Sequence, residues 1–468
     1  MTFGAPSHRI ESQVKAAAQI MELDADCMYL PNMAIISMRL GEKGVMRTFF
    51  IRARGRVALT SLQKVHQIYR NVLHDNLPAA SGTHALKRLL LASPIYNLGT
   101  RCFLAFMSAS IICGLSFGGS ILDMWISGIC ACALQYLGLN AANKSAMYAN
   151  VYEISVTIVV AFVARGLSSI PGDLFCYTAI SSAGVVVILP GFTVLISALE
   201  LMSRNIFCGS VRIVYAIIYT LFLGFGLTIG SDLYLLVDPK ARKNYYHSTS
   251  DATNHAHSNL TYLHGTFMML NGSSVLTPIT GVLGIHEDGG KGSNIIVKGC
   301  VRDVNWEWWR QQLPWWTMFL LVPIYSTCSS LSNLQYWRSM KLLVMVFISC
   351  CSFAANRASG LMLPGRTDIV SAAGALVIGT LGNIYSRLGR GTAFTTMVTG
   401  VLFLVPSGIA QGGGVTQTFH TSEEQYSSGF SLALRMVTVA AGVTIGLFVS
   451  QCIVYLFGAR KNAAHFAF

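Results

Sequence analysis

From Leu98 onward the chain consists of apolar runs that are each about as long as a lipid bilayer is thick. A helix needs roughly 20 apolar residues to cross the hydrocarbon core. Only helices and closed barrels satisfy all their backbone hydrogen bonds in lipid, so runs of this length predict helices. We therefore predict an all-α polytopic membrane protein with ten transmembrane helices. The ten runs are 99–117, 120–139, 148–166, 174–201, 211–231, 315–333, 341–356, 367–386, 392–411 and 429–457.

Composition excludes an ordinary soluble protein. Hydrophobic residues make up 53% of the 468 residues, charged residues only 11%, and the mean hydropathy is +0.53. The net charge of +13 does not indicate nucleic acid, because the basic residues lie mostly before the first apolar run and in short loops. The expected partner of the chain is therefore the lipid bilayer.

The reactive residue types form no motif for metal or enzyme chemistry. The twelve cysteines are scattered without a Cys-x-x-Cys pair, so we interpret them as small hydrophobic residues rather than as a disulfide scaffold or a zinc site. His255 and His257 alternate with polar neighbours in a loop, which loop composition explains better than a metal does. His-Glu-x-x-His and Gly-x-x-x-x-Gly-Lys patterns are absent. We expect no cofactor and no enzyme.

The chain divides where its polarity changes. The first 96 residues alternate helical and strand-like spacing, including strand-like runs at 34–38 and 48–51, which predicts a small α/β domain. A polar loop of about eighty residues separates the fifth run from the sixth. The predicted units are an α/β domain (1–96), a first five-helix unit (97–232), a loop (233–313), a second five-helix unit (314–458) and a tail (459–468).

Basic residues indicate which side of the membrane each end occupies. Twelve Lys and Arg lie within residues 1–96, and the positive-inside rule places this domain and the tail in the cytoplasm. The long loop then lies outside, and it contains two glycosylation acceptor patterns that begin at Asn259 and Asn271. The membrane itself, plasma membrane or vacuolar and other endomembranes, is left open.

Two of the apolar runs contain helix-breaking residues near their middle. Pro190-Gly191 interrupts the fourth run, and Pro406-Ser407-Gly408 interrupts the ninth. Proline removes a backbone donor, so the freed carbonyls need protein, water or a ligand as partners. Discontinuous helices at this depth form the binding sites of many transporters. The alternative is that Pro and Gly are simply more frequent in membrane helices than in soluble ones.

The second set of five runs resembles the first, with offsets of 213, 215, 216 and 223 residues. Because five is odd, the second unit must enter the membrane from the opposite side, so we predict two inverted five-helix repeats. The matched pairs are Asn143 with Asn356, Glu153 with Asp368, Pro190 with Pro406, and Arg212 with Arg435.

These residues are the candidates for a transport site. We predict substrate contacts by Pro190, Gly191, Pro406, Ser407, Gly408, Asn143, Asn356, Arg212 and Arg435. Glu153 and Asp368 are candidates for proton coupling, because ionisable residues inside spans often serve function. The alternatives are interfacial carboxylates exposed to water and arginines that anchor to lipid headgroups. We interpret Glu200 as a cap at the inner face that pairs with Arg204.

Several motifs resemble a known family. They are Gly4-Ala5-Pro6-Ser7-His8-Arg9, Tyr136-Leu137-Gly138-Leu139-Asn140, Ser210-Val211-Arg212-Ile213-Val214-Tyr215-Ala216, Gly382-Asn383-Ile384-Tyr385-Ser386-Arg387 and Val405-Pro406-Ser407-Gly408. With Pro190-Gly191 they resemble the threonine/serine exporter (ThrE-like) family, and most closely its fungal branch of pheromone-regulated membrane proteins. The similarity covers nearly the whole chain except the outer loop. Fungal members usually carry a long hydrophilic extension before the Gly-Ala-Pro motif, so we expect a shortened form here.

The resemblance implies a ten-span carrier with a cytoplasmic N-terminal domain. Bacterial relatives export threonine and serine, and relatives split into two subunits are linked to succinate export. We therefore expect a secondary active transporter that exports a small carboxylate-bearing solute of the threonine/serine type, coupled to protons. A dicarboxylate exporter and a non-transporting signalling or fusion component are the alternatives, and a homo-oligomer is left open.

Overall fold

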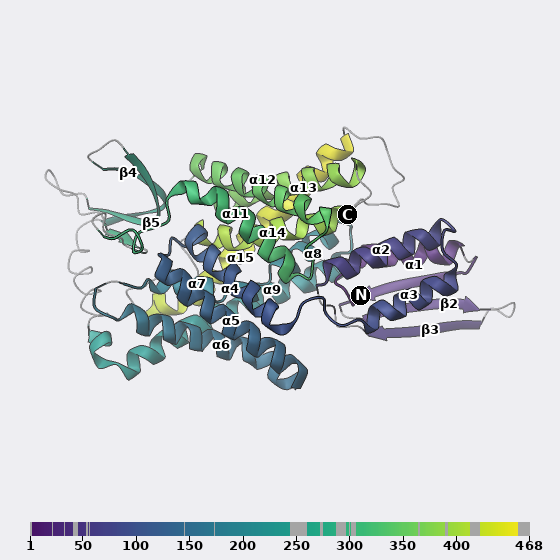
Figure 1. Ribbon diagram of the computed structural model, residues 1–468, viewed down its shortest axis with the longest axis horizontal. Helices are drawn as coiled ribbons and strands as arrows, with labels where there is room; N and C mark the ends of the chain where they lie inside the picture. The colour runs from purple at the N-terminus through teal and green to yellow at the C-terminus, as the bar shows by residue number, and fades with distance from the viewer. Residues whose placement is uncertain are drawn as a thin grey trace.

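The computed structural model describes most of the chain (Figure 1). The described residues are 2–20, 22–31, 33–40, 45–52, 55, 57–144, 146–172, 174–243, 260–271, 275–286, 296–298, 300, 306–363, 366–388, 392–411 and 422–456. They form a long helical body with a small α/β domain at one end and a β-hairpin region at the other.

The N-terminal domain consists of one three-stranded sheet and three helices. The sheet is an antiparallel meander in the order β1-β2-β3, with Cys27 opposite Ile36 and Ile36 opposite Phe49. The predicted α/β character of this region is confirmed, and the two predicted strand-like runs lie in β2 and β3. The elements are α1 (Ser7–Ile20), β1 (Ala25–Leu30), β2 (Met33–Leu40), β3 (Val45–Arg52), α2 (Leu59–Leu73) and α3 (Ala79–Leu91).

The apolar part of the chain is helical, as the run lengths predict. Its first half contains α4 (Leu98–Ser116), α5 (Ile121–Lys144), α6 (Ala146–Ser168), α7 (Tyr177–Gly184), the 3-10 turn η1 (Val186–Ile188), α8 (Gly191–Met202) and α9 (Ile206–Val237). Strands β4 (Leu260–Asn271), β5 (Val275–His286) and β6 (Ile296–Lys298) follow. The second half contains η2 (Trp315–Thr317), α11 (Met318–Ser332), α12 (Met340–Met362), α13 (Thr367–Leu388), α14 (Ala393–Gln411) and α15 (Ser422–Leu456).

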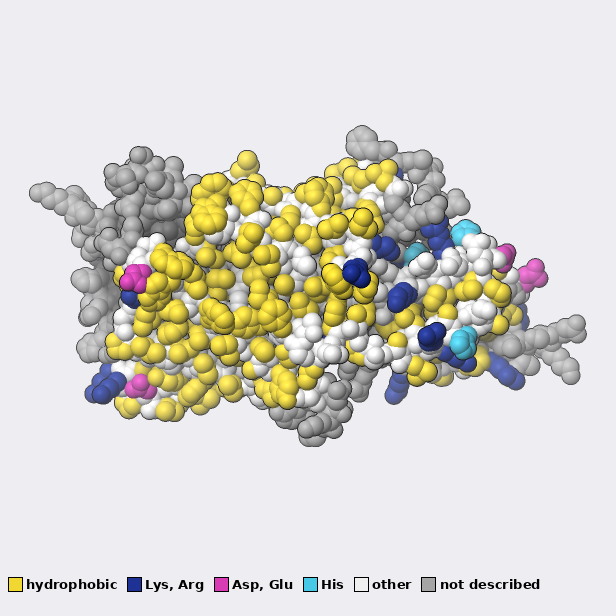
Figure 2. All heavy atoms as spheres, in the orientation of Figure 1, with side chains coloured by type: hydrophobic (Ala, Val, Ile, Leu, Met, Phe, Trp, Pro, Cys, Tyr) yellow, Lys and Arg dark blue, Asp and Glu magenta, His cyan; other side chains and the backbone are white. Residues whose placement is uncertain are grey.

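The helical body has the surface of a membrane protein. Within the described residues, six helices are long and apolar enough to cross a bilayer, and the bent pair formed by α7 and α8 would make a seventh span. Apolar side chains cover the middle of the face shown in Figure 2, whereas Lys and Arg side chains gather over the N-terminal domain. The predicted multi-pass membrane character is therefore confirmed, while the number of ten spans stays a prediction.

The first predicted helix break is present. Helix α7 ends at Gly184, the chain passes through η1, and α8 begins at Gly191, with a bend of 56° between the two helical segments. Two local features explain the break. Four consecutive β-branched residues, Val185 to Ile188, have low helix propensity, and the residue before a proline is disfavoured in the helical region. Leu189 accordingly adopts an extended backbone with ψ of 135°.

The second predicted break is absent, and that prediction was wrong. Helix α14 runs from Ala393 to Gln411 with Pro406 inside it. Pro406 deprives the Leu402 carbonyl of its usual donor, but a single lost bond does not end a membrane helix that is packed by neighbours. The residues before Pro406 form no continuous β-branched run, since Leu402, Phe403 and Leu404 separate Val401 from Val405, unlike the run before Pro190. The Ser407 hydroxyl also donates to the Leu404 carbonyl oxygen at 2.9 Å.

The helices that open the two halves run antiparallel. At one end, the Tyr96 hydroxyl just before α4 donates to the Gln335 carbonyl oxygen just after α11, at 2.7 Å. At the other end, the side chain of Leu313, ahead of α11, lies against Gly114 near the end of α4. Helices α4 and α11 therefore run in opposite directions.

The last helix of each half packs on the third helix in the same manner. A Cβ added to Gly230 would lie 2.8 Å from the Ala161 Cβ, and one added to Gly446 would lie 2.8 Å from the Ala375 Cβ. Each glycine also abuts a backbone carbonyl of the facing helix, at Ile158 in α6 and Ala372 in α13. Glycine is the residue that permits two helix backbones to approach this closely.

These contacts disagree with two of the predicted matches between the halves. Ile158 and Ala372 differ by 214 residues, so along α6 and α13 Asp368 corresponds to Ile154 rather than to Glu153. Gly230 and Gly446 differ by 216 residues, so along α9 and α15 Arg435 corresponds to Tyr219 rather than to Arg212. The offset of 223 taken from the two Arg-x-Val patterns is two helical turns too long. The match of Pro190 with Pro406, at 216, agrees with the packing.

Enlarging either interface glycine should destabilise the helical body. We expect Gly230→Ala and Gly446→Ala each to cost about 1–3 kcal/mol, because the added methyl overlaps the facing backbone. The melting temperature of the protein in detergent would measure this loss of stability. Gly99→Ala is the matched control, since a Cβ at Gly99 meets nothing within 4 Å among the described atoms. Equal melting temperatures for all three variants would contradict the close approach.

The interpretation of the cysteines as small hydrophobic residues was wrong for one pair. Cys176, directly before α7, is bonded to Cys300, which lies ahead of α11 and 124 residues further along the chain. Their separation in sequence hid the pair, because spacing rules detect only local cysteine patterns. Disulfides persist in oxidising compartments, which agrees with the predicted outer position of both segments.

Thiol labelling should reveal this bond directly. In unfolded, unreduced protein a maleimide reagent should leave Cys176 and Cys300 untouched, and reduction should make two further sites available. Mass spectrometry of the labelled peptides would measure both states. Free cysteines such as Cys113, which is buried and outside the bond, serve as the control because they should react before reduction. Labelling of Cys176 without reductant would exclude the disulfide.

Candidate functional site

A cavity of about 220 Å³ lies beside the break in the α7–α8 segment. Residues from both halves of the helical body line it, and the lining contains both apolar and polar side chains. The lining residues are Arg101, Ala105 and Ser108 in α4, Gln135 in α5, Val186, Val187, Leu189 and Gly191 around the break, Tyr325, Ser329, Ser332 and Asn333 at α11, and Leu402, Val405 and Pro406 in α14.

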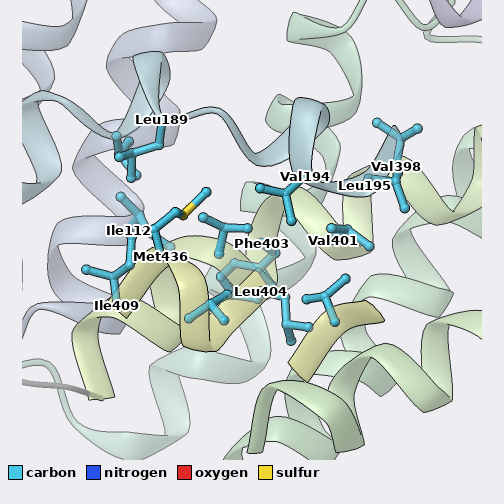
Figure 3. Packing of buried hydrophobic residues seen from close by; sticks show 14 of the residues in the cluster. Ile112, Leu189, Val194, Leu195, Val398, Val401, Phe403, Leu404, Ile409 and Met436 are labelled. Carbon is cyan, nitrogen blue, oxygen red and sulfur yellow. The ribbon is translucent and has the colours of Figure 1, made fainter. Parts of the chain in front are cut away.

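The two proline segments meet at this cavity. A Cβ added to Gly191 would lie 3.2 Å from Leu402 Cδ2, so glycine permits the close approach of α8 to α14. The ring of Phe192 lies edge-on to that of Phe394, with 6.2 Å between centroids. Leu189, Val194, Val401, Phe403 and Leu404 belong to one cluster of buried hydrophobic residues (Figure 3). The proximity of the two segments, predicted from the sequence, is therefore observed, although only one of the helices is broken.

The cavity has a single type of charge. Among the described residues that line it, Arg101 is the only ionisable one apart from Tyr325. It lies one turn inside α4, within reach of the broken segment across the cavity. A guanidinium presents several donors in a planar fork that matches a carboxylate. Sequence reasoning missed Arg101, although it lies within the first predicted run (99–117) and an arginine inside a span is itself a functional signal.

Hydroxyl and amide groups complete the polar lining. Ser108 is 8% exposed, and its Oγ has no hydrogen-bond partner among the described residues. Ser332 Oγ is likewise buried without a partner there. A buried polar atom without a partner costs free energy unless water or a ligand satisfies it. These hydroxyls therefore suit a polar solute that enters the cavity.

Backbone groups add to this polarity. Pro190 is the N-cap of α8 and contributes no side-chain cap, so the first amides of α8 lack that partner. Pro406 leaves the Leu402 carbonyl without its helical donor. Donors at a helix start and a free carbonyl on the facing helix can bind the opposite charges of one small molecule.

The predicted substrate residues fall into two groups. Gly191 and Pro406 line the cavity, and Pro190 directly precedes its wall. Ser407 is directed to its own helix through the Leu404 carbonyl. Asn356 is 2% exposed in α12 and is not among the lining residues.

Some predicted residues fall outside what the structure describes. Asn143 and Gly408 belong to α5 and α14, but their surroundings are not among the described side chains. Asn259 lies outside the described residues, and Asn271 is described only as the last residue of strand β4. The two glycosylation sites therefore stay predictions.

The two candidate coupling carboxylates do not line the cavity. Glu153 is half-buried in α6, where the Tyr152 hydroxyl donates to its Oε1 at 3.3 Å. Asp368 is exposed in the first turn of α13, a position where a carboxylate stabilises a helix start. If these carboxylates couple proton movement to transport, they would do so by shifting α6 and α13 and not by contact with a solute in the cavity.

Arg212 does not line the cavity. It belongs to a cluster with Glu200 and Tyr29 at the contact with the N-terminal domain. It pairs with Glu200 at 3.3 Å and donates to the Tyr29 hydroxyl at 3.4 Å. The predicted pairing of Glu200 with Arg204 was therefore wrong. Arg204 follows the end of α8 with φ of +63°, and this left-handed turn directs the chain into α9. Arg435, in α15, is partly buried and is also not a lining residue.

The N-terminal domain presents buried bases at its contact with the helical body. Arg9 Nη2 lies 2.9 Å from His66 Nδ1, and because arginine can only donate, His66 accepts. Burial, followed by the charge of Arg9, lowers the pKa of His66 to about 4, so the ring is neutral at pH 7. Burial likewise lowers the pKa of His8 to about 4. These rings pack as neutral groups rather than as cations.

The site offers no metal chemistry within the part of the chain that the structure describes, where no three His, Cys, Asp or Glu side chains converge on one point. What the cavity offers is a guanidinium, hydroxyls, amides and backbone dipoles around a small enclosed space. These groups bind and orient a polar anion or zwitterion, and they contain no nucleophile–base pair of the type that breaks covalent bonds.

The comparisons with known proteins agree with this arrangement. A family model described as "Putative threonine/serine exporter" matches residues 1–234. A second, described as "Threonine/Serine exporter, ThrE", matches residues 322–453. The two matches correspond to the two halves of the helical body, the first including the N-terminal domain. No solved structure matches the chain.

The chain is also similar to fungal proteins over nearly its whole length. "Pheromone-regulated membrane protein 10" of Saccharomyces cerevisiae is 31% identical over 99% of this chain and 53% of its own length. The protein of the same name in Debaryomyces hansenii is 32% identical over 99% of this chain and 41% of its own. The chain thus spans about half the length of these relatives. With half of its residues covered by one family model and the second half by the other, the chain belongs to the threonine/serine exporter (ThrE) family.

Proposed function

We propose that this protein is a secondary active transporter that exports a small carboxylate-bearing solute, of the threonine/serine type, from the cytosol. The observation that carries the proposal is the cavity at the α7–α8 break, which is lined by Arg101, Gly191 and Pro406 among other residues. The family membership supports export of hydroxy amino acids.

The size and polarity of the cavity support a small solute. A volume of 220 Å³ corresponds to about seven water molecules at roughly 30 Å³ each. It lies below the range of about 300–1,000 Å³ that is typical of pockets for drug-sized ligands. Arg101 would bind the carboxylate, and the Leu402 carbonyl with the Ser108 hydroxyl would bind an ammonium or hydroxyl group.

Alternating access would come from two inverted five-helix repeats. The antiparallel direction of α4 and α11 and the equivalent glycine contacts of α9 and α15 support this arrangement. Two related halves of opposite orientation can exchange conformations and open the same cavity to either side. In this proposal residues 1–96 and the tail lie in the cytoplasm, and the disulfide and the loop 233–313 lie outside.

Counterflow of labelled threonine in proteoliposomes tests the proposal. Vesicles loaded with unlabelled threonine should accumulate the label transiently, and serine should compete. The control is protein with Gly191→Leu, whose side chain would collide with Leu402 and fill the cavity wall. Absence of counterflow for every amino acid and dicarboxylic acid, in protein that keeps its melting temperature, would contradict a transport function.

A dicarboxylate is the second candidate substrate. It is favoured by the lining of the cavity, where the described residues include Arg101 but no Asp or Glu to pair with an ammonium group. A site of this charge should prefer an anion over a zwitterion. Competition between unlabelled succinate and threonine in the same counterflow assay separates the two candidates.

Proton coupling by Glu153 and Asp368 is the remaining part of the proposal. We expect Glu153→Gln to abolish accumulation driven by a proton gradient while counterflow continues, since exchange needs no net proton movement. Asp368→Asn should behave in the same way if both halves contribute. Uptake driven by an imposed pH gradient measures this, with Asp75→Asn, an exposed residue of the N-terminal domain, as the control. Normal gradient-driven uptake in both variants would remove the coupling role.

A further inference from the structure

Helix α8 connects the cavity to the N-terminal domain. Gly191, its first residue, lines the cavity, and Glu200 lies nine residues further on in the same helix. At about 1.5 Å per residue the two positions are roughly 14 Å apart along the helix axis. A displacement at the Glu200 end is therefore transmitted to the cavity wall by a short stretch of rigid helix.

Irregular backbone at both ends lets this helix move as a unit. It begins after Pro190, which has ψ of 43°, and ends at Met202, two residues before Arg204, which has φ of +63°. Hinges are a few residues at the ends of elements that absorb changes in φ and ψ. Because the backbone is irregular at Pro190 and at Arg204, the position of α8 depends on its side-chain contacts.

At its inner end α8 is held by the N-terminal domain. Glu200 is 0% exposed, and its Oε1 accepts a hydrogen bond at 3.0 Å from the backbone amide of Ser7, the first residue of α1. The same oxygen pairs with Arg212 of α9 at 3.3 Å. One carboxylate thus joins α8, α9 and the start of α1.

Four further bonds surround this carboxylate and cross the same interface. In one of them Asn205 Nδ2 donates to Glu11 Oε1 at 3.3 Å. Asn205 Nδ2 donates to Ser7 Oγ at 3.0 Å, Cys208 Sγ donates to the Tyr29 carbonyl oxygen at 3.1 Å, and Arg212 Nη2 donates to the Tyr29 hydroxyl at 3.4 Å. Buried polar groups of α8 and α9 therefore find their partners on α1 and β1. Separating the domain would leave them unsatisfied, which makes the contact specific.

We propose that Glu200 and Arg212 are positioning residues, through which the N-terminal domain holds α8 and thereby sets the geometry of the cavity wall at Gly191. The contact joins the N-terminal domain to α8 within one chain. Neither Glu200 nor Arg212 lines the cavity. By linkage, any solute that shifts α8 on binding in the cavity must also change the stability of the contact with α1.

Hydrogen exchange of the full chain in lipid nanodiscs tests this inference without any substrate. In Glu200→Gln, which keeps the size and one acceptor of the side chain but loses the charge, we expect the amides of residues 186–194 to exchange about tenfold faster. Tyr29→Phe removes only the hydroxyl that meets Arg212, so it should produce a smaller change of the same sign. Ser37→Ala, in the exposed part of the sheet, is the control and should change nothing there.

Two results would overturn the inference. One is faster exchange confined to residues 1–30 and 197–212, with residues 186–194 unchanged, which would show that the contact does not reach the cavity. The other is an equal increase in α12 and α13, which would show general unfolding rather than release of α8. If Glu200→Gln does not fold, Tyr29→Phe decides by the same criteria. Because no solute is used, failure here leaves the transport proposal untouched.

Discussion

Replacing Arg101 by glutamine should weaken binding of a carboxylate-bearing solute about 100-fold. Removing one partner of a desolvated charge pair costs about 2–5 kcal/mol, and each 1.4 kcal/mol is about tenfold in affinity. Arg101 is the cationic group in the wall of the cavity, so its loss should remove most of the electrostatic contribution to binding. The half-saturating concentration in counterflow measures the change.

Two further variants make this prediction specific. Arg101→Lys retains the charge but loses the planar fork, so it should recover part of the affinity. Arg366→Gln, in an exposed position before α13, should leave the affinity unchanged. Equal affinities in Arg101→Gln and the unaltered protein would show that the solute binds elsewhere.

Glu200→Ala should destabilise the protein by about 3–5 kcal/mol, because it leaves Arg212 largely buried without its carboxylate. The side chain of Arg212 is only 17% exposed and that of Glu200 is 0% exposed. The amide of Ser7 would also lose its acceptor. Unfolding in detergent measures the loss, and the double variant with Arg212→Ala should cost less than the sum of the two single changes.

The protein contains a matched control for this ion pair. Arg39 and Asp24 form a salt bridge at the same distance of 3.3 Å, but their side chains are 54% and 69% exposed. An exposed pair contributes only about 0–1 kcal/mol, so Asp24→Ala should change the stability little. A similar loss in Asp24→Ala and Glu200→Ala would mean that burial does not make the Glu200 contact special.

Local sequence signals were sufficient for much of the fold. Apolar run lengths indicated a multi-pass membrane protein, strand-like runs indicated β2 and β3, and Pro190-Gly191 indicated the break between α7 and α8. In each case the physical cause lies within about twenty consecutive residues, such as hydrocarbon thickness, strand periodicity or the missing amide of proline. The family resemblance rests on motifs of the same length and is confirmed by the family matches.

Contacts between distant segments decided the rest. Pro190 lies at a helix break, whereas Pro406 is accommodated within α14. Cys176 is bonded to Cys300, which is 124 residues away in the sequence. Arg101 became a cavity residue only because α4 packs beside α11, and Glu200 pairs with Arg212 instead of the nearer Arg204. The sequence by itself determined which segments are helical and apolar. Which charged side chains face the cavity and which hold the domains together depended on tertiary packing, because the free energy of a buried charge is set by the partners that enclose it.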